Sequence, residues 1–279
     1  MIWKNKPGKD WLVNLDEHRR KEKPHGHPWP GPWYSDDGED GVLNYLFEYI
    51  NDKHKFAVDL GAAHGMGGSQ IRYLADKYDW GTTEFDYGMW NPMHKRIRRE
   101  KILKDTICDR LKHWNTPKEF DLLSLDIDSM DYYILTAILV GGYRPNVAII
   151  EYNPIFAHDE YYVRNYDENF RKDSTSGYGA GIGCFVKLMN EGDYTLIHNF
   201  ANVVTDDNGV GIEDKSVQAN NLLFLHNKFI EEDTIIPSIS ELHPKPWIES
   251  WKRKNIEFGS NIEEIKKYMI ENRFTKLEL

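Results

Sequence analysis

Three continuous apolar runs, each with an acidic residue at or near its end, constrain the fold of this chain more than any other feature. They cover residues 55–60, 120–126 and 147–151. Runs that are apolar at successive positions are typical of strands buried on both faces, as in parallel sheets. Apolar residues at helical spacing come between and beyond them, in 69–77, 92–100, 130–139 and 181–191. This alternation predicts an α/β fold with a doubly wound, Rossmann-like sheet.

The rest of the chain divides around this core, which we place at residues 35–227. A further strand is predicted at 80–84, and 194–198 with 221–226 is expected to close the sheet as a hairpin-like pair. Residues 35–40 offer cap oxygens and carboxylates before an amphipathic helix. Residues 1–34 hold five of the twelve prolines and are expected to form an irregular arm. Residues 228–279 are expected to form a helical extension packed on the core, with helices at 246–254 and 261–271.

Composition narrows the classes of partner. A net charge of −10 disfavours binding to phosphate backbones, so we expect no nucleic-acid partner. No stretch of 18 apolar residues exists, so we expect no membrane partner. The two cysteines form no disulfide framework and the first 30 residues contain no signal-like apolar run, which favours a cytoplasmic protein. A small-molecule substrate is the expected partner, and a homo-oligomer is left open.

The glycine-containing turn after the first apolar run indicates a ligand site. Its sequence, Asp59-Leu-Gly-Ala-Ala-His-Gly65, lets a ligand approach the backbone, although a tight turn that packs a helix on a strand has the same pattern. Glu84 follows 25 residues after Asp59, where an acidic residue can accept hydrogen bonds from ribose hydroxyls. The turn lacks the pattern that grasps a diphosphate, which favours S-adenosylmethionine over NAD as the ligand.

Six short motifs in one order carry a resemblance to a known family. They are Ser35-x-x-Gly-Glu-Asp40, Val58-Asp-Leu-Gly-Ala-Ala-x-Gly65, Trp80-Gly-x-x-x-Glu84, Phe120-Asp-Leu-Leu-Ser-Leu-Asp-Ile-Asp128, Ile149-Ile-Glu-Tyr-Asn153 and Asn220-Asn221. Through them the chain resembles the FkbM-type and related small-molecule O-methyltransferases, which use S-adenosylmethionine. The resemblance implies a class I methyltransferase sheet of seven mostly parallel strands with helices on both faces. It also implies an acceptor site above Asp126 and Glu151. The residues expected to bind the methyl donor are Asp59, Gly61, Ala62, Gly65, Glu84 and Asp126.

A second group of polar residues follows two neighbouring strands. Asp126, Glu151 and Asn153 resemble the metal ligands of catechol-type O-methyltransferases, and oxygen ligands of this kind suit Mg²⁺ or Mn²⁺. We therefore predict these three residues as a metal site. Asp128 and Asp131 lie in the same region, and capping of the helix that begins near Met130 is an equally good explanation for those two.

The expected activity is metal-assisted O-methylation of a hydroxyl on a small molecule, with a sugar or sugar-containing metabolite suggested by family analogy alone. Asp126, Asp128 and His158 are the candidate catalytic residues, His158 because it follows the strand that ends at Glu151. Two alternatives stay open. One is metal-independent N-methylation, in which Asp128 or Glu151 accepts the amine proton. The other is a non-catalytic nucleotide-binding or scaffold protein whose acids only cap helices.

Overall fold

The computed structural model describes most of the core and parts of both ends of the chain. The described residues are 3–19, 35, 38–51, 53–62, 69–88, 96–128, 130–170, 178–200, 221–242 and 262–278. The helix predicted at 246–254 lies outside these residues. Gly65 and the neighbouring part of the glycine turn, residues 63–68, also lie outside them.

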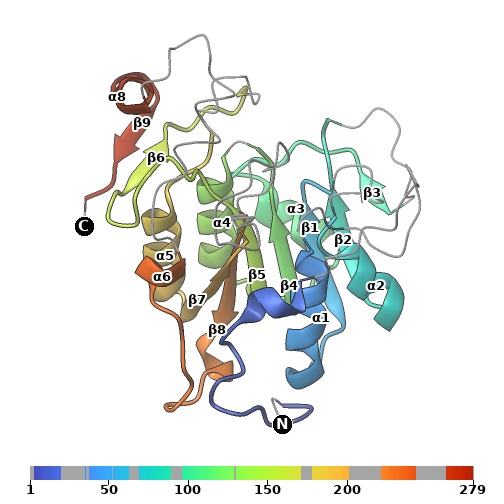
Figure 1. Ribbon diagram of the computed structural model, residues 1–279. Helices are drawn as coiled ribbons and strands as arrows, with labels where there is room; N and C mark the ends of the chain where they lie inside the picture. The colour runs from blue at the N-terminus through green and yellow to red at the C-terminus, as the bar shows by residue number, and fades with distance from the viewer. Residues whose placement is uncertain are drawn as a thin grey trace, which may run out of the picture.

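Seven strands form one sheet, in the order β3-β2-β1-β4-β5-β8-β7 (Figure 1). The strands are β1 (Phe56–Leu60), β2 (Gly81–Phe85), β3 (Ile97–Arg98), β4 (Glu119–Leu125), β5 (Arg144–Glu151), β7 (Tyr194–Asn199) and β8 (Asn221–His226). The pairings among β1, β2, β3, β4 and β5 are parallel. Strand β8 runs antiparallel to both of its neighbours, β5 and β7.

Helices pack on both faces of this sheet, because successive residues of each central strand point to opposite faces. Val58 and Leu60 of β1 belong to an apolar cluster that they share with α3 (Ile107–His113), α4 (Asp131–Val140) and α5 (Ile182–Glu191). Ala57 of β1 belongs to a second cluster, shared with α1 (Glu39–Tyr49) and α2 (Arg72–Tyr78). The predicted Rossmann-like α/β fold is therefore confirmed, with the strand order and the single antiparallel strand of a class I methyltransferase sheet.

The residues predicted to cap α1 serve its first turn in a different way from an N-cap, because the N-cap residue is Gly38 and makes no side-chain cap hydrogen bond. The backbone N–H of Asp40 donates to Ser35 Oγ over 3.2 Å, and Ser35 Oγ donates to Asp40 Oδ1 over 2.8 Å. This exchange satisfies one backbone donor of the first helical turn from a residue outside the helix. It also fixes the start of α1, where Glu39 and Asp40 are both buried.

The arm predicted to be irregular has only one short helical turn among its described residues, η1 (Leu15–His18). Trp11, Leu12 and Leu15 are nevertheless buried in the same apolar cluster as α1. The Trp11 ring stands edge-on to Trp3 at 5.5 Å between centroids. Residues 3–19 therefore belong to the core of the fold, and their irregular backbone is compensated by aromatic packing.

The helix predicted at 92–100 is wrong in its last part, because Ile97 and Arg98 form the edge strand β3 beside β2. Residues 92–95 lie outside the described part of the chain. The pattern of an apolar residue followed by a basic one, Ile97 and Arg98, fits an edge strand as well as a helix, since only one face of such a strand is buried. Helix α3 lies further along the chain, between β3 and β4.

The C-terminal extension contains a strand as well as helices. After η2 (Asn227–Phe229), α6 (Ile239–Leu242) and α8 (Ile262–Asn272), the chain forms β9 (Phe274–Lys276). Strand β9 pairs antiparallel with β6 (Tyr162–Arg164), which follows β5 (Figure 1). The predicted helix at 261–271 is confirmed as α8, whereas β9 was not predicted. None of the helices in the described residues has the length and apolar character needed to cross a membrane.

Candidate active site

The acidic residues singled out in the sequence meet at one edge of the sheet. Parallel strands β1, β2, β4 and β5 all end there, and the antiparallel strand β8 begins there. Open α/β sheets bind their ligands at this carboxyl edge. The order of the strands separates the acids into a first half on β1 and β2 and a second half on β4, β5 and β8.

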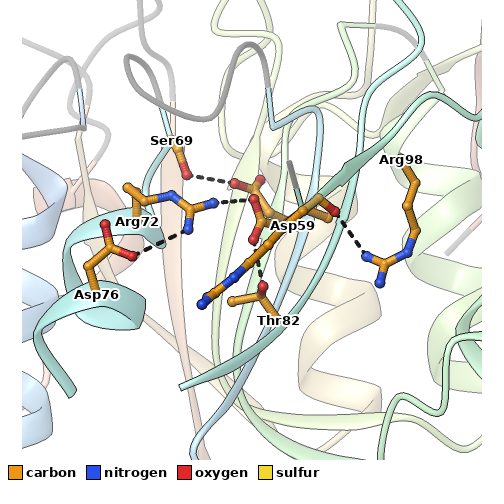
Figure 2. Close-up of polar contacts among 8 residues, drawn as sticks. Asp59, Ser69, Arg72, Asp76, Thr82 and Arg98 are labelled. Carbon is orange, nitrogen blue, oxygen red and sulfur yellow. Dashed lines mark hydrogen bonds and ion pairs between the residues drawn. The ribbon is translucent and has the colours of Figure 1, made fainter. Parts of the chain in front are cut away.

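Asp59 and Glu84 form the first half and are directly opposite each other in the β1–β2 register. Asp59 Oδ2 accepts a hydrogen bond from Ser69 Oγ over 2.8 Å, as Figure 2 shows. Burial raises the pKa of Asp59 to about 7, and the charge of Glu84 adds to the rise, while Ser69 and the guanidinium of Arg72 oppose it. A carboxyl that exchanges its proton near neutral pH is typical of a functional site.

Glu84 is fully buried and is held on both of its carboxylate oxygens. Oε1 accepts from Thr82 Oγ1 over 2.5 Å, and Oε2 forms an ion pair with Nη2 of Arg72, from helix α2. Figure 2 shows the guanidinium of Arg72 between Asp76 and Asp59. Glu84 thus lies where the sequence places it, at the end of β2, but with a cationic partner that the sequence analysis did not identify.

Gly61 has a structural reason to be glycine. Its φ is +100°, and a Cβ atom on it would lie 1.7 Å from the carbonyl oxygen of Asp126. The glycine therefore lets β1 pass close to the backbone that follows β4. Ala62 is buried, and its N–H donates to the carbonyl of Phe85 over 3.1 Å. The predicted roles of Gly61 and Ala62 in donor binding stay predictions.

The second half contains a compact group of three acids. Asp126, Asp128 and Glu151 each place a carboxylate oxygen within 4.8 Å of the others. Asp128 adopts a left-handed backbone conformation, with φ of +57°, in the loop between β4 and α4. This turn is uncommon for a residue other than glycine, and it brings Asp128 back towards the end of β5. We call Asp126, Asp128 and Glu151 the acidic cluster.

Asn221 extends this half of the site onto β8. It is directly opposite Glu151 in the antiparallel register, so the two side chains share one face of the sheet. Its Nδ2 donates to Glu39 Oε1 of helix α1 over 3.1 Å. Its Oδ1 is buried and accepts no hydrogen bond within the described residues. A buried acceptor without a donor is costly, so a donor or a cation bound at this atom would be favourable.

Two residues predicted in this region hold its backbone. Asn153 is fully buried; its Nδ2 donates to the carbonyl of Tyr178 over 2.9 Å and its Oδ1 accepts from the N–H of Ile155 over 3.2 Å. Asp131 Oδ1 accepts from the N–H of Ile127 over 2.9 Å, which closes the loop before α4, whereas the N-cap residue of α4 is Met130 and makes no side-chain cap hydrogen bond. Asn153 as a metal ligand stays a prediction, and Asp128 is the residue found with Asp126 and Glu151.

Two histidines of the described residues near this edge, His158 and His198, differ in their surroundings. His158 is partly exposed in the loop after β5, and its carbonyl packs against Gly183 at the start of α5. His198, on β7, is buried, and its Nε2 lies 3.3 Å from Asp16 Oδ1 and 3.4 Å from Arg19 Nη2, both from the N-terminal arm. His198 therefore helps to dock the arm. His158 as general base stays a prediction.

Sequence reasoning missed Arg72 and did not assign site roles to Glu39 and Asn221. Glu39 and Asn221 stand within motifs that were recognised, but nothing in their spacing shows that α1 and β8 meet. Arg72 carried a weak signal, because an arginine in the first turn of a helix after a ligand-binding turn lies near the strand ends.

Comparisons with known proteins add little to this geometry. No protein-family model matches the chain, and no curated protein matches it. One solved structure with some likeness is described as "Putative hemolysin from Streptococcus thermophilus"; it is 13% identical and covers 89% of this chain and 78% of that chain. Its TM-score is 0.35, which is too low to carry an argument. The fold is therefore assigned from its own strand order and directions.

Proposed function

We propose that this protein is an S-adenosylmethionine-dependent methyltransferase that methylates a hydroxyl on a small molecule, with a sugar-containing metabolite as the acceptor suggested by family analogy. One observation carries the proposal: Asp59 and Glu84 lie opposite each other at the ends of β1 and β2 in a sheet of class I methyltransferase order. This pair suits the methyl donor, whose ribose hydroxyls would bind Glu84. The acidic cluster next to it would then face the acceptor. We call the first half of the site, on β1 and β2, the donor half, and the second half, on β4, β5 and β8, the acceptor half.

The residues of the acidic cluster fit a divalent cation. Three carboxylate oxygens within 4.8 Å repel one another, and a cation relieves that repulsion. The neighbouring Oδ1 of Asn221, buried and without a donor among the described residues, is a further oxygen ligand of the kind that Mg²⁺ and Mn²⁺ prefer. Asp126, Asp128 and Glu151 would hold the ion. When bound, such an ion lowers the pKa of an acceptor hydroxyl and fixes its position.

The chain's own residues then have simple tasks. In methyl transfer the carbon–sulfur bond of the sulfonium breaks as the carbon–oxygen bond forms, so the reaction depends on alignment of donor and acceptor. The hydroxyl proton must leave, and Asp128 and His158 are the candidates to accept it. The backbone of Gly61, in the donor half, lies close to the backbone of Asp126, in the acceptor half, so the two halves are in direct contact at this edge of the sheet.

Isothermal titration with S-adenosylmethionine and S-adenosylhomocysteine tests the donor assignment. We expect micromolar binding of both ligands and, with the protein as purified, a co-purifying adenosine compound detectable by mass spectrometry. Failure of both ligands to bind folded protein would remove the proposal and favour the non-catalytic alternative. Methylation of a panel of hydroxylated acceptors, with and without a chelator, then tests the reaction and the need for a metal.

Metal-independent N-methylation is the second candidate, and the acidic cluster itself favours it. Three carboxylates close together attract an ammonium ion as well as a divalent cation. Asp128 or Glu151 would then accept the proton that an amine releases. Full activity on an amine in metal-free protein, verified by elemental analysis, would establish this candidate and exclude metal-assisted O-methylation.

A further inference from the structure

Arg72 is the buried cation of the donor half. It is the first residue of α2, its side chain has no exposed surface, and it is among the largest fully buried side chains of the described residues. Its Nη2 pairs with Glu84 Oε2, and its Nη1 lies 3.5 Å from Asp76 Oδ1. Figure 2 shows Arg72 beside Asp76. The guanidinium thus bridges a fully buried acid and an acid whose side chain is 44% exposed.

Helix stability does not explain this placement. The N-terminal end of a helix carries partial positive charge, which disfavours a cation and favours an acid. Helix α2 nevertheless begins with Arg72 and has no acidic residue in its first turn. The arginine is therefore at an unfavourable position in its own helix, and the reason for its presence lies in the strands beneath it.

The strands beneath α2 supply that reason. Asp59 and Glu84 are neighbours in register and are both buried, so each charge opposes the other. The guanidinium compensates this charge, and it also acts on Asp59, whose pKa it lowers. A buried ion pair of this kind adds little to stability compared with apolar side chains of the same size. Its presence is better explained by a need for an ordered, charged carboxylate.

The hydrogen bonds of Glu84 show what the ordered carboxylate offers. A carboxylate has about four acceptor positions, two on each oxygen. Within the described residues Thr82 occupies one position on Oε1 and Arg72 occupies one on Oε2. One acceptor position therefore remains on each oxygen. Two hydroxyls on adjacent carbons, as in ribose, need that arrangement.

From this geometry we infer that Arg72 is a positioning residue for the methyl donor: it holds Glu84 in the orientation in which the carboxylate accepts one hydrogen bond from each ribose hydroxyl. This inference rests on the proposed function, and it adds a residue that itself makes no contact with the ligand. Arg72 acts on ligand binding through Glu84, and Thr82 supports the same orientation from the other oxygen.

The test measures recognition of ribose rather than affinity alone. The dissociation constants of S-adenosylhomocysteine and its 2′-deoxy analogue are measured for each protein, and their ratio reports the hydrogen bond to the 2′-hydroxyl. We expect the wild-type ratio to be about 10-fold or more, as for hydrogen bonds to charged groups. In Arg72→Met the ratio should fall towards 1, and Arg72→Lys should restore part of it. A purely structural role would weaken both ligands equally.

Asp76→Ala is the matched control, because it removes the exposed partner of the same guanidinium and should leave the ratio unchanged. If Arg72→Met does not fold, Thr82→Val removes the other hydrogen bond to Glu84 with little change in shape and should lower the ratio about 3-fold, a neutral-hydrogen-bond magnitude.

An unchanged ratio in a folded Arg72→Met protein, or in Thr82→Val where Arg72→Met is unfolded, overturns the inference while the proposed function stands. Tighter binding by Arg72→Met also overturns it, since Arg72 would then compete with the ligand. If the wild-type protein binds neither ligand, both the inference and the proposed function fail.

Discussion

The two halves of the carboxyl edge hold their acids in opposite ways. On β1 and β2, Asp59 and Glu84 are each held by other side chains, a serine hydroxyl for one and a guanidinium and a threonine hydroxyl for the other. On β4 and β5, Asp126, Asp128 and Glu151 are brought against one another within 4.8 Å. The first arrangement is already ordered for a neutral polar ligand. The second brings negative charges together, and a positive charge close to them would stabilise it.

This contrast predicts that each half can be disabled without the other, and the largest effect should come from Asp126. Asp126→Asn removes one charge from the acidic cluster, and we expect methyl transfer to fall by at least about 100-fold, since even indirect partners of a metal commonly contribute 10- to 100-fold. Affinity for S-adenosylhomocysteine should remain within about 3-fold of wild type, because asparagine keeps an acceptor oxygen at this position and only the contribution of the charge is lost. Activity assays and titration calorimetry check the two expectations. Equal loss of donor affinity would show that the halves are one site.

Glu84→Ala tests the donor half, and here we expect donor binding to weaken while metal binding is unchanged. Donor binding should weaken by about 1.5 to 3 kcal/mol, the magnitude of hydrogen bonds to a charged group. Binding of Mn²⁺, followed by electron paramagnetic resonance, should be unchanged, because Glu84 is not part of the acidic cluster. Asp128→Asn is the control with the opposite pattern: Mn²⁺ binding should weaken and donor affinity should be unchanged. Unchanged donor affinity in folded Glu84→Ala would contradict the ribose assignment.

Asp59 gives the donor half a dependence on pH. Its pKa is raised from 3.8 to about 7 by burial and by Glu84, so between these values the folded protein holds a proton that the unfolded chain has lost. Stability should therefore fall as pH rises from about 4 to 7, with a slope of at most about 1.4 kcal/mol per pH unit, the value for one proton. Denaturant unfolding at pH 5 and pH 7.5 should show a smaller fall in Asp59→Asn than in wild type. A parallel fall in both proteins would exclude Asp59 as its source.

The smallest effect should come from Asn221, at the border of the acceptor half. Asn221→Leu removes the buried Oδ1 and should weaken Mn²⁺ binding by about 5-fold, close to 1 kcal/mol for one neutral ligand atom. Donor affinity should not change. Asn146→Leu is a suitable comparison, because Asn146 is also buried with an Oδ1 that has no donor among the described residues, but it lies within β5 rather than at its carboxyl end. Equal Mn²⁺ affinity in both variants and wild type would remove Asn221 from the site.

The sequence predicted the sheet better than it predicted the contacts across it. Continuous apolar runs indicated β1, β4 and β5 because strands buried on both faces leave little room for polar positions. The strand-end acids followed from the same runs. Arg72 and Asn221 were not assigned because their importance depends on which helix covers which face, and local periodicity carries no such information. Asp128 joins the cluster through a left-handed backbone turn, which the identity of an aspartate does not predict.

The pairing of β6 with β9 also has a consequence for the order of folding. Strands β1, β2, β4 and β5 and their helices come from one continuous stretch of chain, whereas the hydrogen bond from Thr275 to Asn165 beside β6 spans 110 residues. Contacts between distant residues form late, and during synthesis β9 emerges after the other strands that the structure describes. Asn153 and β6 both bond to the 178–180 segment, so the loop beyond Glu151 is tied to this late strand. A nascent chain that has not yet reached β9 would thus have the strand ends of β1 and β2 assembled while the loop beyond Glu151 is still incomplete.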